Sequence, residues 1–315
     1  MIRDQKKILI TGVAGFIGSN LASRLLDEGY NVVGIDNLAY GLRENVPEGV
    51  HFHHVDIRDR EIFTLFENVD TVFHLAAKNC IADCQADPVE TAEINVSGTV
   101  NVFEASKRAG VRKVIYAESS ALYEGSSAFP TPESEVKPES FYALSKLASM
   151  YFASAYEKFY GLKFTALRYF CVYGPVQDYR RTIPPVMSAF IIKLLKGERP
   201  IIYGTGEKRR DFVYVDDVND FHMICMRDDR TNGKVFNIGS GVNYSVHEVL
   251  DKVSKMLKVT SDPIYKDDLP GEAQVTLADI TQAKSLGWKP RIPLEKGLEK
   301  AIEYIRKEMA AGKIP

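Results

Sequence analysis

The sequence predicts an α/β fold in which a doubly wound parallel sheet is followed by a smaller, mixed C-terminal lobe. Apolar strand-like segments alternate with helical ones through the first 170 residues, and this alternating pattern becomes irregular after about residue 172. Alternation of this kind is typical of parallel strands that helices cover on both faces. We therefore predict a cofactor-binding domain over residues 1–172 and a smaller substrate-binding lobe over 173–315, between which the chain can cross.

Six strands are predicted in the first domain. Each is a short run rich in apolar and β-branched residues, and turn-forming residues separate it from the next helical segment. In chain order the runs are KILITG (7–12), NVVGID (31–36), VHFHHVD (50–56), VDTVFHLAA (69–77), VRKVIYAESS (111–120) and KFTALRYF (163–170).

The helices are predicted from their patterns and their ends. The first follows KILITG and stops at Gly29, and a long one begins near Asp87-Pro88 and ends before Gly110. Proline suits the first turn of a helix and glycine suits its C-terminal cap, which fixes both ends of the long helix. Further helices are predicted up to Gly161, at 185–196 and near 294–309.

Composition excludes several classes of protein. Of the 315 residues, 45% are hydrophobic, which is enough for a sizeable core, and the formal net charge of −2 gives no basic field for nucleic acid or an anionic membrane surface. No apolar run approaches the roughly 18 residues that span a bilayer, and the N-terminus enters a strand without a signal-like segment, so we expect a cytoplasmic protein. The scattered cysteines predict neither a disulfide framework nor a metal site; they are Cys80, Cys84, Cys171 and Cys225.

A glycine-rich turn, TGVAGFIG, follows the first strand and opens the first helix. Its glycines, Gly12, Gly15 and Gly18, permit a tight turn and a close approach of the backbone to a ligand. The helix N-terminus then offers unpaired N–H groups to a pyrophosphate, so the turn indicates a Rossmann-like dinucleotide site. Asp36 and Asn37 end the second strand, where a carboxylate accepts hydrogen bonds from a ribose and disfavours a 2′-phosphate, which favours NAD over NADP. The alternatives are a turn without a ligand and an ordinary turn-forming aspartate.

Tyr142 and Lys146 lie four residues apart in a predicted helix, and so on one face of it. A nearby ammonium would lower the pKa of the phenol and make Tyr142 a base at neutral pH. Pairs of this spacing also occur by chance on helix surfaces, so the spacing alone does not decide between the two readings.

Taken together, the motifs resemble the extended short-chain dehydrogenases/reductases, and among them the NAD-dependent nucleotide-sugar epimerases. The resemblance covers nearly the whole chain, and the order of the motifs makes it specific. The motifs are TGVAGFIGSN (11–20), DNLAYG (36–41), HLAA (74–77), NVSGT (95–99), SSALY (119–123), YALSK (142–146), RYFCVYGP (168–175) and RRDFVYVDDV (209–218).

The resemblance implies a catalytic set. Tyr142 is the acid/base, Lys146 holds the nicotinamide ribose and lowers the pKa of the tyrosine, and Ser119 hydrogen-bonds the sugar 4-hydroxyl, with Ser120 as the second choice. NAD removes a hydride from C4 of a UDP-hexose while Tyr142 takes the O4 proton, and the hydride returns to the other face of the 4-keto sugar. The expected activity is C4 epimerisation of UDP-glucose/UDP-galactose, and of the N-acetylated pair UDP-N-acetylglucosamine/UDP-N-acetylgalactosamine.

The resemblance also implies contacts with NAD and with the UDP-sugar. Arg210 is expected to bind the diphosphate, and Thr276 to leave room for an N-acetyl group at C2; the alternatives are a solvated basic turn and an ordinary strand threonine. A homodimer is expected through the helices near 88–109 and 140–160. Besides Tyr142 and Lys146, the expected NAD contacts are Gly12, Gly15, Phe16, Ile17, Gly18, Asp36, Asn37, Asp56, Ile57, Leu75, Ala76, Ala77, Lys78 and Asn95.

The sequence departs from the family pattern at four positions. Glu118 stands where a serine is frequent, Glu124 where glycine follows the tyrosine of SSALY, Cys171 where asparagine is common, and Leu269 where many relatives have an arginine that binds the diphosphate. Cysteine is a much weaker hydrogen-bonding group than asparagine. Three arginines are candidates to replace the missing one, namely Arg180, Arg181 and Arg209.

Two other kinds of function fit part of the pattern. A nucleotide-sugar dehydratase would carry an Asp-Glu pair after the catalytic hydroxyl residue, and here Ser120 and Ala121 follow Ser119 instead. A reductase would exchange its dinucleotide, and a non-catalytic protein that binds NAD or a nucleotide sugar would not need the intact set of Ser119, Tyr142 and Lys146.

Overall fold

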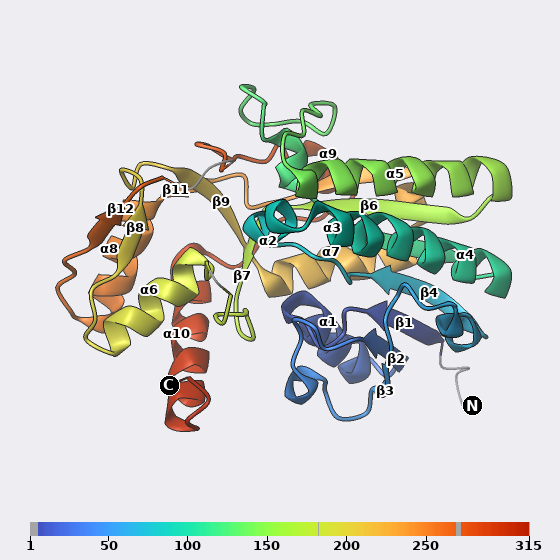
Figure 1. Ribbon diagram of the computed structural model, residues 1–315, viewed down its shortest axis with the longest axis horizontal. Helices are drawn as coiled ribbons and strands as arrows, with labels where there is room; N and C mark the ends of the chain where they lie inside the picture. The colour runs from blue at the N-terminus through green and yellow to red at the C-terminus, as the bar shows by residue number, and fades with distance from the viewer. Residues whose placement is uncertain (1–5, 182, 269–271, 315) are drawn as a thin grey trace. The chain divides into compact units, whose positions relative to one another are not determined.

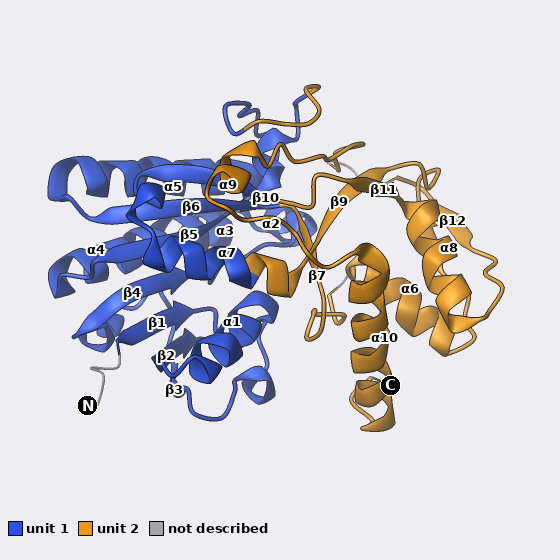
Figure 2. Cartoon of the chain, turned by 180° about the vertical axis from the view of Figure 1, so that it is seen from behind, with its two compact units in different colours: residues 1–126, 133–169, 219–237 blue, residues 127–132, 170–218, 238–315 orange. Residues whose placement is uncertain are grey.

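The computed structural model describes residues 6–181, 183–268 and 272–314 (Figure 1). Within them the chain forms two compact units, each assembled from three separate stretches, and Figure 2 colours them separately. Unit 1 comprises residues 1–126, 133–169 and 219–237, and unit 2 comprises 127–132, 170–218 and 238–315. The functional division of the chain at residues 172 and 173 remains a proposal, since these units are defined by packing alone.

Unit 1 is built on a seven-stranded sheet in the order β10-β6-β5-β4-β1-β2-β3. Pairing is parallel from β6 through β3, and the order reverses direction at β1, as a doubly wound sheet requires. Its strands are β1 (Lys7–Thr11), β2 (Asn31–Asp36), β3 (His51–His54), β4 (Val69–His74), β5 (Lys113–Ser119), β6 (Lys163–Tyr169) and β10 (Lys234–Ile238).

Helices cover both faces of this sheet. On one face Tyr116 of β5 packs against Phe103 and lies beneath Lys146, while on the other Phe73 of β4 packs edge-on against His222. Figure 1 shows the two long helices of the first face, α4 and α5, side by side, and the two pack against each other. The helices are α1 (Phe16–Asp27), α2 (Ile81–Ala86), α3 (Pro88–Ala92), α4 (Thr99–Ala109), α5 (Phe141–Tyr160) and α7 (Val215–Arg227).

The predicted strands and long helices of the first domain are found close to their expected positions. The helix expected from Asp87-Pro88 to Gly110 is a continuous run in which a π-helical segment, Glu93–Gly98, joins α3 to α4, and Gly110 caps it in a left-handed conformation. α7 and the seventh strand, β10, are not among the predicted elements. Both come from beyond residue 173 and complete unit 1, because the chain returns to it there.

Unit 2 is smaller and mixed, as expected. A three-stranded sheet of order β11-β9-β7 combines parallel and antiparallel pairing, and β12 pairs with β8 in a second small sheet. Its elements are β7 (Cys171–Tyr173), α6 (Val186–Leu195), β8 (Ile201–Tyr203), β9 (Arg209–Tyr214), β11 (Asn243–Ser245), α8 (Val246–Leu257), β12 (Ile264–Lys266), α9 (Thr281–Ser285) and α10 (Leu294–Ala310).

Candidate active site

The glycine-rich turn links β1 to α1 in the form that a pyrophosphate site needs. Gly12 has a φ of +76°, and a Cβ on it would lie 2.8 Å from the main-chain nitrogen of Ala76, so no larger residue fits. Gly15 is the N-cap of α1 and supplies no side-chain cap, which leaves the N–H groups of Phe16 and Ile17 at the helix start open to an anion. A Cβ on Gly18 would collide with the main chain of Gly12, so helix and turn pack in direct contact.

Asp36 lies at the end of β2 and is 8% exposed. Its carboxylate accepts a hydrogen bond from the Ala14 N–H at 3.0 Å and from the Leu38 N–H at 2.8 Å. Burial raises the pKa of Asp36, and these two N–H groups oppose the rise. Each carboxylate oxygen has lone pairs beyond these bonds, so the residues present fit a ribose diol at this strand end.

Asn37 and Asp56 are joined directly. The Asn37 amide donates to Asp56 at 2.7 Å, and the Arg58 guanidinium donates to both oxygens of the same carboxylate. Burial would raise the pKa of Asp56, but Arg58 and its other donors hold it below its ordinary range. Ile57 is buried against Gly98, where a Cβ would meet it. Asn37 and Asp56, two of the expected NAD contacts, are therefore brought together after the ends of β2 and β3.

The segment after β4 is fixed to helix α5 through Asn95. The Asn95 side chain exchanges two hydrogen bonds with the main chain of Lys78, at 2.8 and 2.9 Å, and donates to the Ser145 hydroxyl at 2.9 Å. The Ser145 hydroxyl in turn donates to the main-chain oxygen of Tyr142 at 2.7 Å. The predicted cofactor residues Leu75, Ala76, Ala77 and Lys78 thus share one framework with the predicted acid/base.

The three predicted catalytic residues all lie in unit 1. Ser119 is the last residue of β5, and its hydroxyl accepts a hydrogen bond from the Ala121 N–H at 3.1 Å, which caps a short 3₁₀ helix that begins at Ser120. Tyr142 and Lys146 lie in the first turns of α5, 9% and 2% exposed. The Lys146 ammonium donates to the main-chain oxygen of Ala117, two residues before Ser119, at 2.9 Å.

A buried ion pair lies beside this lysine. Glu118 and Arg168 occupy paired positions on β5 and β6, joined at 2.7 Å, with side chains 0% and 4% exposed. Glu118 shares a face of β5 with Tyr116, whose ring lies 5.1 Å from the Lys146 ammonium. Burial lowers the pKa of Lys146 to about 8, and the Glu118 carboxylate acts in the opposite direction. The second Glu118 oxygen, Oε1, has no hydrogen-bond partner within the described part of the chain.

The two predicted sugar-nucleotide contacts in unit 2 lie on adjacent segments. Thr276 donates its N–H to the main-chain oxygen of Arg209 at 3.0 Å, and its hydroxyl accepts from the Asp211 N–H at 3.2 Å. Between those two residues, Arg210 donates to the main-chain oxygen of Arg209 at 3.0 Å and lies 3.5 Å from Glu272. Since Thr276 uses its hydroxyl in this bond, a substitution there changes hydrogen bonding as well as volume.

Two of the departures from the family pattern, Cys171 and Leu269, fall within the residue ranges of unit 2. Burial raises the pKa of the Cys171 thiol on β7 to about 11, so it stays protonated at neutral pH. The three arginines considered as substitutes for the missing one are already paired, Arg180 and Arg181 with Asp178 and Arg209 with Glu248. Leu269 lies outside the described residues.

Lys208 is a charged residue that the sequence analysis did not single out. It is 5% exposed and pairs with Asp268 and with Glu272, the latter at 2.9 Å. The sequence predicts a binding role for Arg210 in the EKRR run (207–210), with a solvated basic turn as the alternative, and only its burial distinguishes Lys208 from a solvated lysine.

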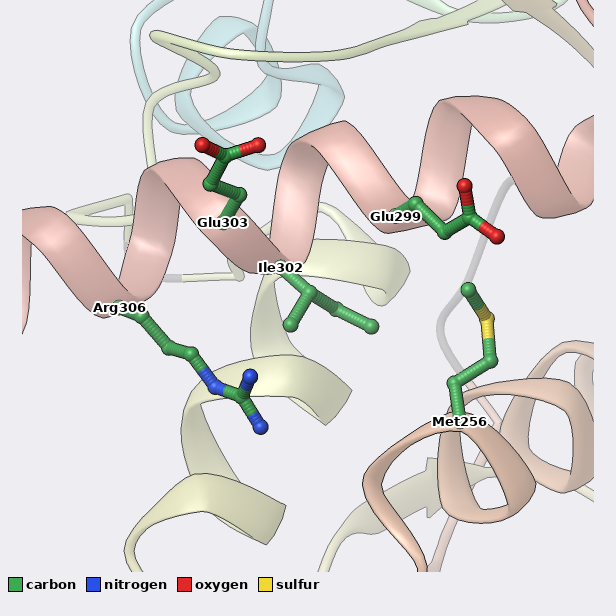
Figure 3. A pocket seen from close by; sticks show the side chains of 5 residues that line it. All are labelled: Met256, Glu299, Ile302, Glu303 and Arg306. Atoms are coloured by element: carbon green, nitrogen blue, oxygen red, sulfur yellow. The ribbon is translucent and has the colours of Figure 1, made fainter.

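Other features of the described residues carry no site. A surface hollow of about 260 Å³ between α8 and α10 is lined by mixed charges and two apolar side chains, and none of the predicted site residues lines it (Figure 3). No group of three or more histidine, cysteine or acidic side chains within the described ranges can hold a metal ion. None of the helices described here is both long and apolar enough to cross a membrane.

Comparison with known proteins places this geometry in a family. Residues 8–239 match the model of the NAD dependent epimerase/dehydratase family. The chain is 35% identical over 310 residues to the UDP-glucose 4-epimerase of Mycolicibacterium smegmatis, covering 95% of this chain and 98% of the relative. It is also 30% identical to UDP-glucuronic acid decarboxylase 1 of Xenopus tropicalis, covering 98% of this chain and 74% of the relative.

Solved structures are similar over almost their whole length. The UDP-glucose 4-epimerase of Thermotoga maritima with UDP-glucose matches with a TM-score of 0.93 and 36% identity, covering 96% of this chain and 99% of that one. The UDP-N-acetylglucosamine 4-epimerase of Methanobrevibacter ruminantium, in complex with UDP-N-acetylmuramic acid, matches with a TM-score of 0.93 and 32% identity, over 98% and 100% of the two chains. The Thermus thermophilus UDP-glucose 4-epimerase with NAD matches with a TM-score of 0.90 and 33% identity, over 95% and 99%.

Proposed function

The chain belongs to the NAD-dependent epimerase/dehydratase family, and from that premise we propose that it inverts C4 of a UDP-hexose with NAD as its cofactor. The observation that carries the proposal is the placement of Lys146, a buried ammonium one helical turn after Tyr142 that donates to the strand end carrying Ser119. A buried ammonium at this position would support acid–base chemistry by the Tyr142 phenol next to a bound sugar.

In the proposed reaction Tyr142 accepts the proton of the sugar 4-hydroxyl. The neighbouring Lys146 ammonium favours the phenolate, because a close positive charge stabilises the charged form of an acid. Ser119 already accepts a hydrogen bond from the Ala121 N–H, so its own O–H is left to donate toward the sugar oxygen.

When bound, NAD supplies the acceptor and later the donor of a hydride at C4. The residues that would hold it are those at the glycine turn, Asp36, the segment after β4 and Lys146, and the tight turn and open helix start fit its pyrophosphate. The 4-keto sugar rotates within the site, so that C4 is reduced from its opposite face. Tyr142 then returns the proton to the oxygen at C4. The cycle leaves the redox state of protein and substrate unchanged.

We further propose that unit 2 selects the UDP-sugar. Arg210 contributes a guanidinium for the diphosphate, whose two phosphates match the planar fork of donors that arginine presents. Thr276 would border the substituent at C2, and its small side chain leaves room for an N-acetyl group. The preferred substrates under this proposal include UDP-N-acetylglucosamine as well as UDP-glucose.

The test is an assay of the purified protein with UDP-glucose, UDP-N-acetylglucosamine and UDP-glucuronate in D₂O, with and without added NAD. We expect the C4 epimer of at least one of the first two sugars, with hydrogen rather than deuterium at C4, because the hydride moves within the site. Absence of an epimer from every sugar, with NAD added, contradicts the proposal. Release of CO₂ from UDP-glucuronate would instead assign the decarboxylase activity named in the Xenopus relative.

A further inference from the structure

Glu124 lies in unit 1 between the segment that carries Ser119 and helix α5, which carries Tyr142. It follows the 3₁₀ helix Ser120–Tyr123, and its N–H donates to the main-chain oxygen of Ala121 at 3.1 Å. The hydroxyl of Ser119 caps the other end of the same helix. Ser119 and Glu124 are therefore the two ends of one short, hydrogen-bonded element.

The Glu124 carboxylate reaches from this element to the start of α5. One oxygen, Oε2, accepts from the N–H of Glu139 at 3.0 Å and from the N–H of Ser140 at 2.7 Å, and the other accepts from the Ser140 hydroxyl at 2.8 Å. Ser140 is the N-cap of α5, where its hydroxyl accepts from the Ala143 N–H at 3.1 Å. Tyr142 is the second residue of that helix.

Two further observations show that the segments are built to lie together. A Cβ on Gly125 would lie 2.7 Å from a carboxylate oxygen of Glu139 and 3.3 Å from the Cβ of Lys137, so the two segments approach each other closely at this glycine. The main chains also pair, with the Lys137 N–H donating to Leu122 at 2.7 Å and the Gly125 N–H donating to Lys137 at 3.0 Å. The glycine expected after Tyr123 is thus found one residue later, and the position before it holds the carboxylate.

From this geometry we propose that Glu124 is a positioning residue that sets Tyr142 relative to Ser119 for the reaction. The inference rests on the proposed function, which gives those two residues a common target at the sugar 4-hydroxyl. Charge-assisted bonds to N–H groups at a helix N-terminus are short and directional, and the helix dipole favours a negative charge there. Because small displacements of reacting groups lower rates strongly, loss of this connection should appear in turnover rather than in binding.

The chemistry of the connection ranks the possible replacements. Glu124→Gln keeps the shape and one carbonyl oxygen for the two N–H groups, but it has no charge and turns a donor toward the Ser140 hydroxyl. Glu124→Ala removes every acceptor. The expected order of turnover is therefore wild type, then Glu124→Gln, then Glu124→Ala.

The experiment compares these variants with a matched change in unit 2. Asp217 likewise accepts from two main-chain N–H groups, those of Arg291 at 2.8 Å and Ile292 at 3.1 Å, just before the N-cap of α10. Glu124→Ala should lower kcat about ten- to a hundredfold with KM changed less than about threefold, while Asp217→Asn lowers Tm with kcat nearly unchanged. In a Ser140→Ala background, Glu124→Ala should have a smaller effect on kcat, since the two side chains act through one connection.

Three outcomes are informative. If Glu124→Ala lowers Tm but leaves kcat at the wild-type value, the carboxylate is only structural and the proposal is overturned. If the wild-type protein turns over no UDP-sugar, the proposed function fails. Amide hydrogen exchange then tests whether Glu124 holds the start of α5 in place. Faster exchange confined to residues 139–143 in Glu124→Ala supports the connection, and unchanged exchange there overturns it.

Discussion

The charge balance around Lys146 is decided by a few residues. Its ammonium is buried, and the Glu118 carboxylate next to it is itself held by Arg168. The other titratable groups around it are Tyr116, Tyr142, His74 and Cys84. Burial disfavours the charged form of Lys146 and lowers its pKa, whereas Glu118, and after it Cys84, favour the charged form, so Glu118 is the largest opposing influence.

This balance predicts the alkaline side of the pH profile. With a pKa of about 8, Lys146 is charged below that pH and neutral above it, so turnover should fall as the pH rises through about 8. Glu118→Gln removes the group that raises this pKa, so the alkaline limb should move down by about one pH unit. The pH dependence of kcat/KM, measured for the wild type and for Glu118→Gln, gives the position of the alkaline limb and its shift.

A second variant is the control for misfolding, because Glu118→Gln leaves Arg168 buried without its partner. In the double variant Glu118→Gln with Arg168→Gln both charges are absent, and the limb should still move to lower pH. An unchanged limb in both variants would exclude Glu118 from control of Lys146.

Tyr142→Phe tests the proposed acid/base itself. The variant keeps the ring but lacks the group that carries the proton, so turnover should fall at least about a hundredfold. NAD content and Tm should remain near those of the wild type. Turnover close to the wild-type value would remove Tyr142 from the mechanism.

Thr276 tests the choice of sugar. Thr276→Tyr should abolish activity on UDP-N-acetylglucosamine by filling the space for the N-acetyl group, while UDP-glucose remains largely usable. Thr276→Val is the matched control, because it also loses the hydrogen bond from the Asp211 N–H but adds almost no volume. Equal losses on the two sugars in Thr276→Tyr, or no loss on either, would remove Thr276 from the sugar site.

At the scale of elements, α5 stands out by its exposed apolar side chains. One face packs on the sheet, yet the helix also carries large apolar side chains that are 43–70% exposed in this chain. A helix that is apolar beyond its packed face is typical of an interface. The exposed side chains are Phe141, Leu144, Tyr151, Phe152, Phe159 and Tyr160.

We therefore predict a two-fold dimer in which α4 and α5 of each copy form a four-helix contact. Light scattering at micromolar concentration should give the dimer mass. Replacing Tyr151 and Phe159 by glutamate together should give a folded monomer that still binds NAD. A monomeric wild-type protein would contradict this assignment of the face.

At the scale of the whole molecule, the two compact units are not consecutive in the chain, since each is assembled from three separate stretches. Most of β10 and most of α7 belong to unit 1 although both follow β7, β8 and β9 in sequence. Lys113, at the start of β5, donates to the main-chain oxygen of Cys225 at 2.7 Å and to the Thr231 hydroxyl at 2.6 Å, and so fixes the returning segment. The sheet of unit 1 is therefore complete only when residues 219–237 are present.

This threading predicts the behaviour of a truncated protein. Residues 1–172 alone should fail to give a cooperatively unfolding, NAD-binding domain, because the β6 edge and the apolar face under α7 would be uncovered. Circular dichroism melting of the fragment, with the full chain as control, measures this. A fragment with a sharp transition and bound NAD would show that the returning segment is dispensable.

The sequence alone determined the features that depend on local pattern. The alternation of strands and helices, the glycine turn and the order of the motifs predicted the sheet domain, NAD as the cofactor and the family, since each depends on residues close together in the chain. Local patterns also singled out Gly12, Asp36, Tyr142 and Lys146, whose functional roles stay predictions.

Only the tertiary structure decided the features made by residues far apart. The pairing of Glu118 with Arg168, the reach of Glu124 to Ser140 and the return of β10 to the sheet depend on how strands and helices pack, and no local pattern encodes them. Glu118 and Glu124 were recognised in the sequence only as departures from the family pattern. Their partners gave these departures a physical meaning, because a carboxylate's effect depends on which donors and charges surround it.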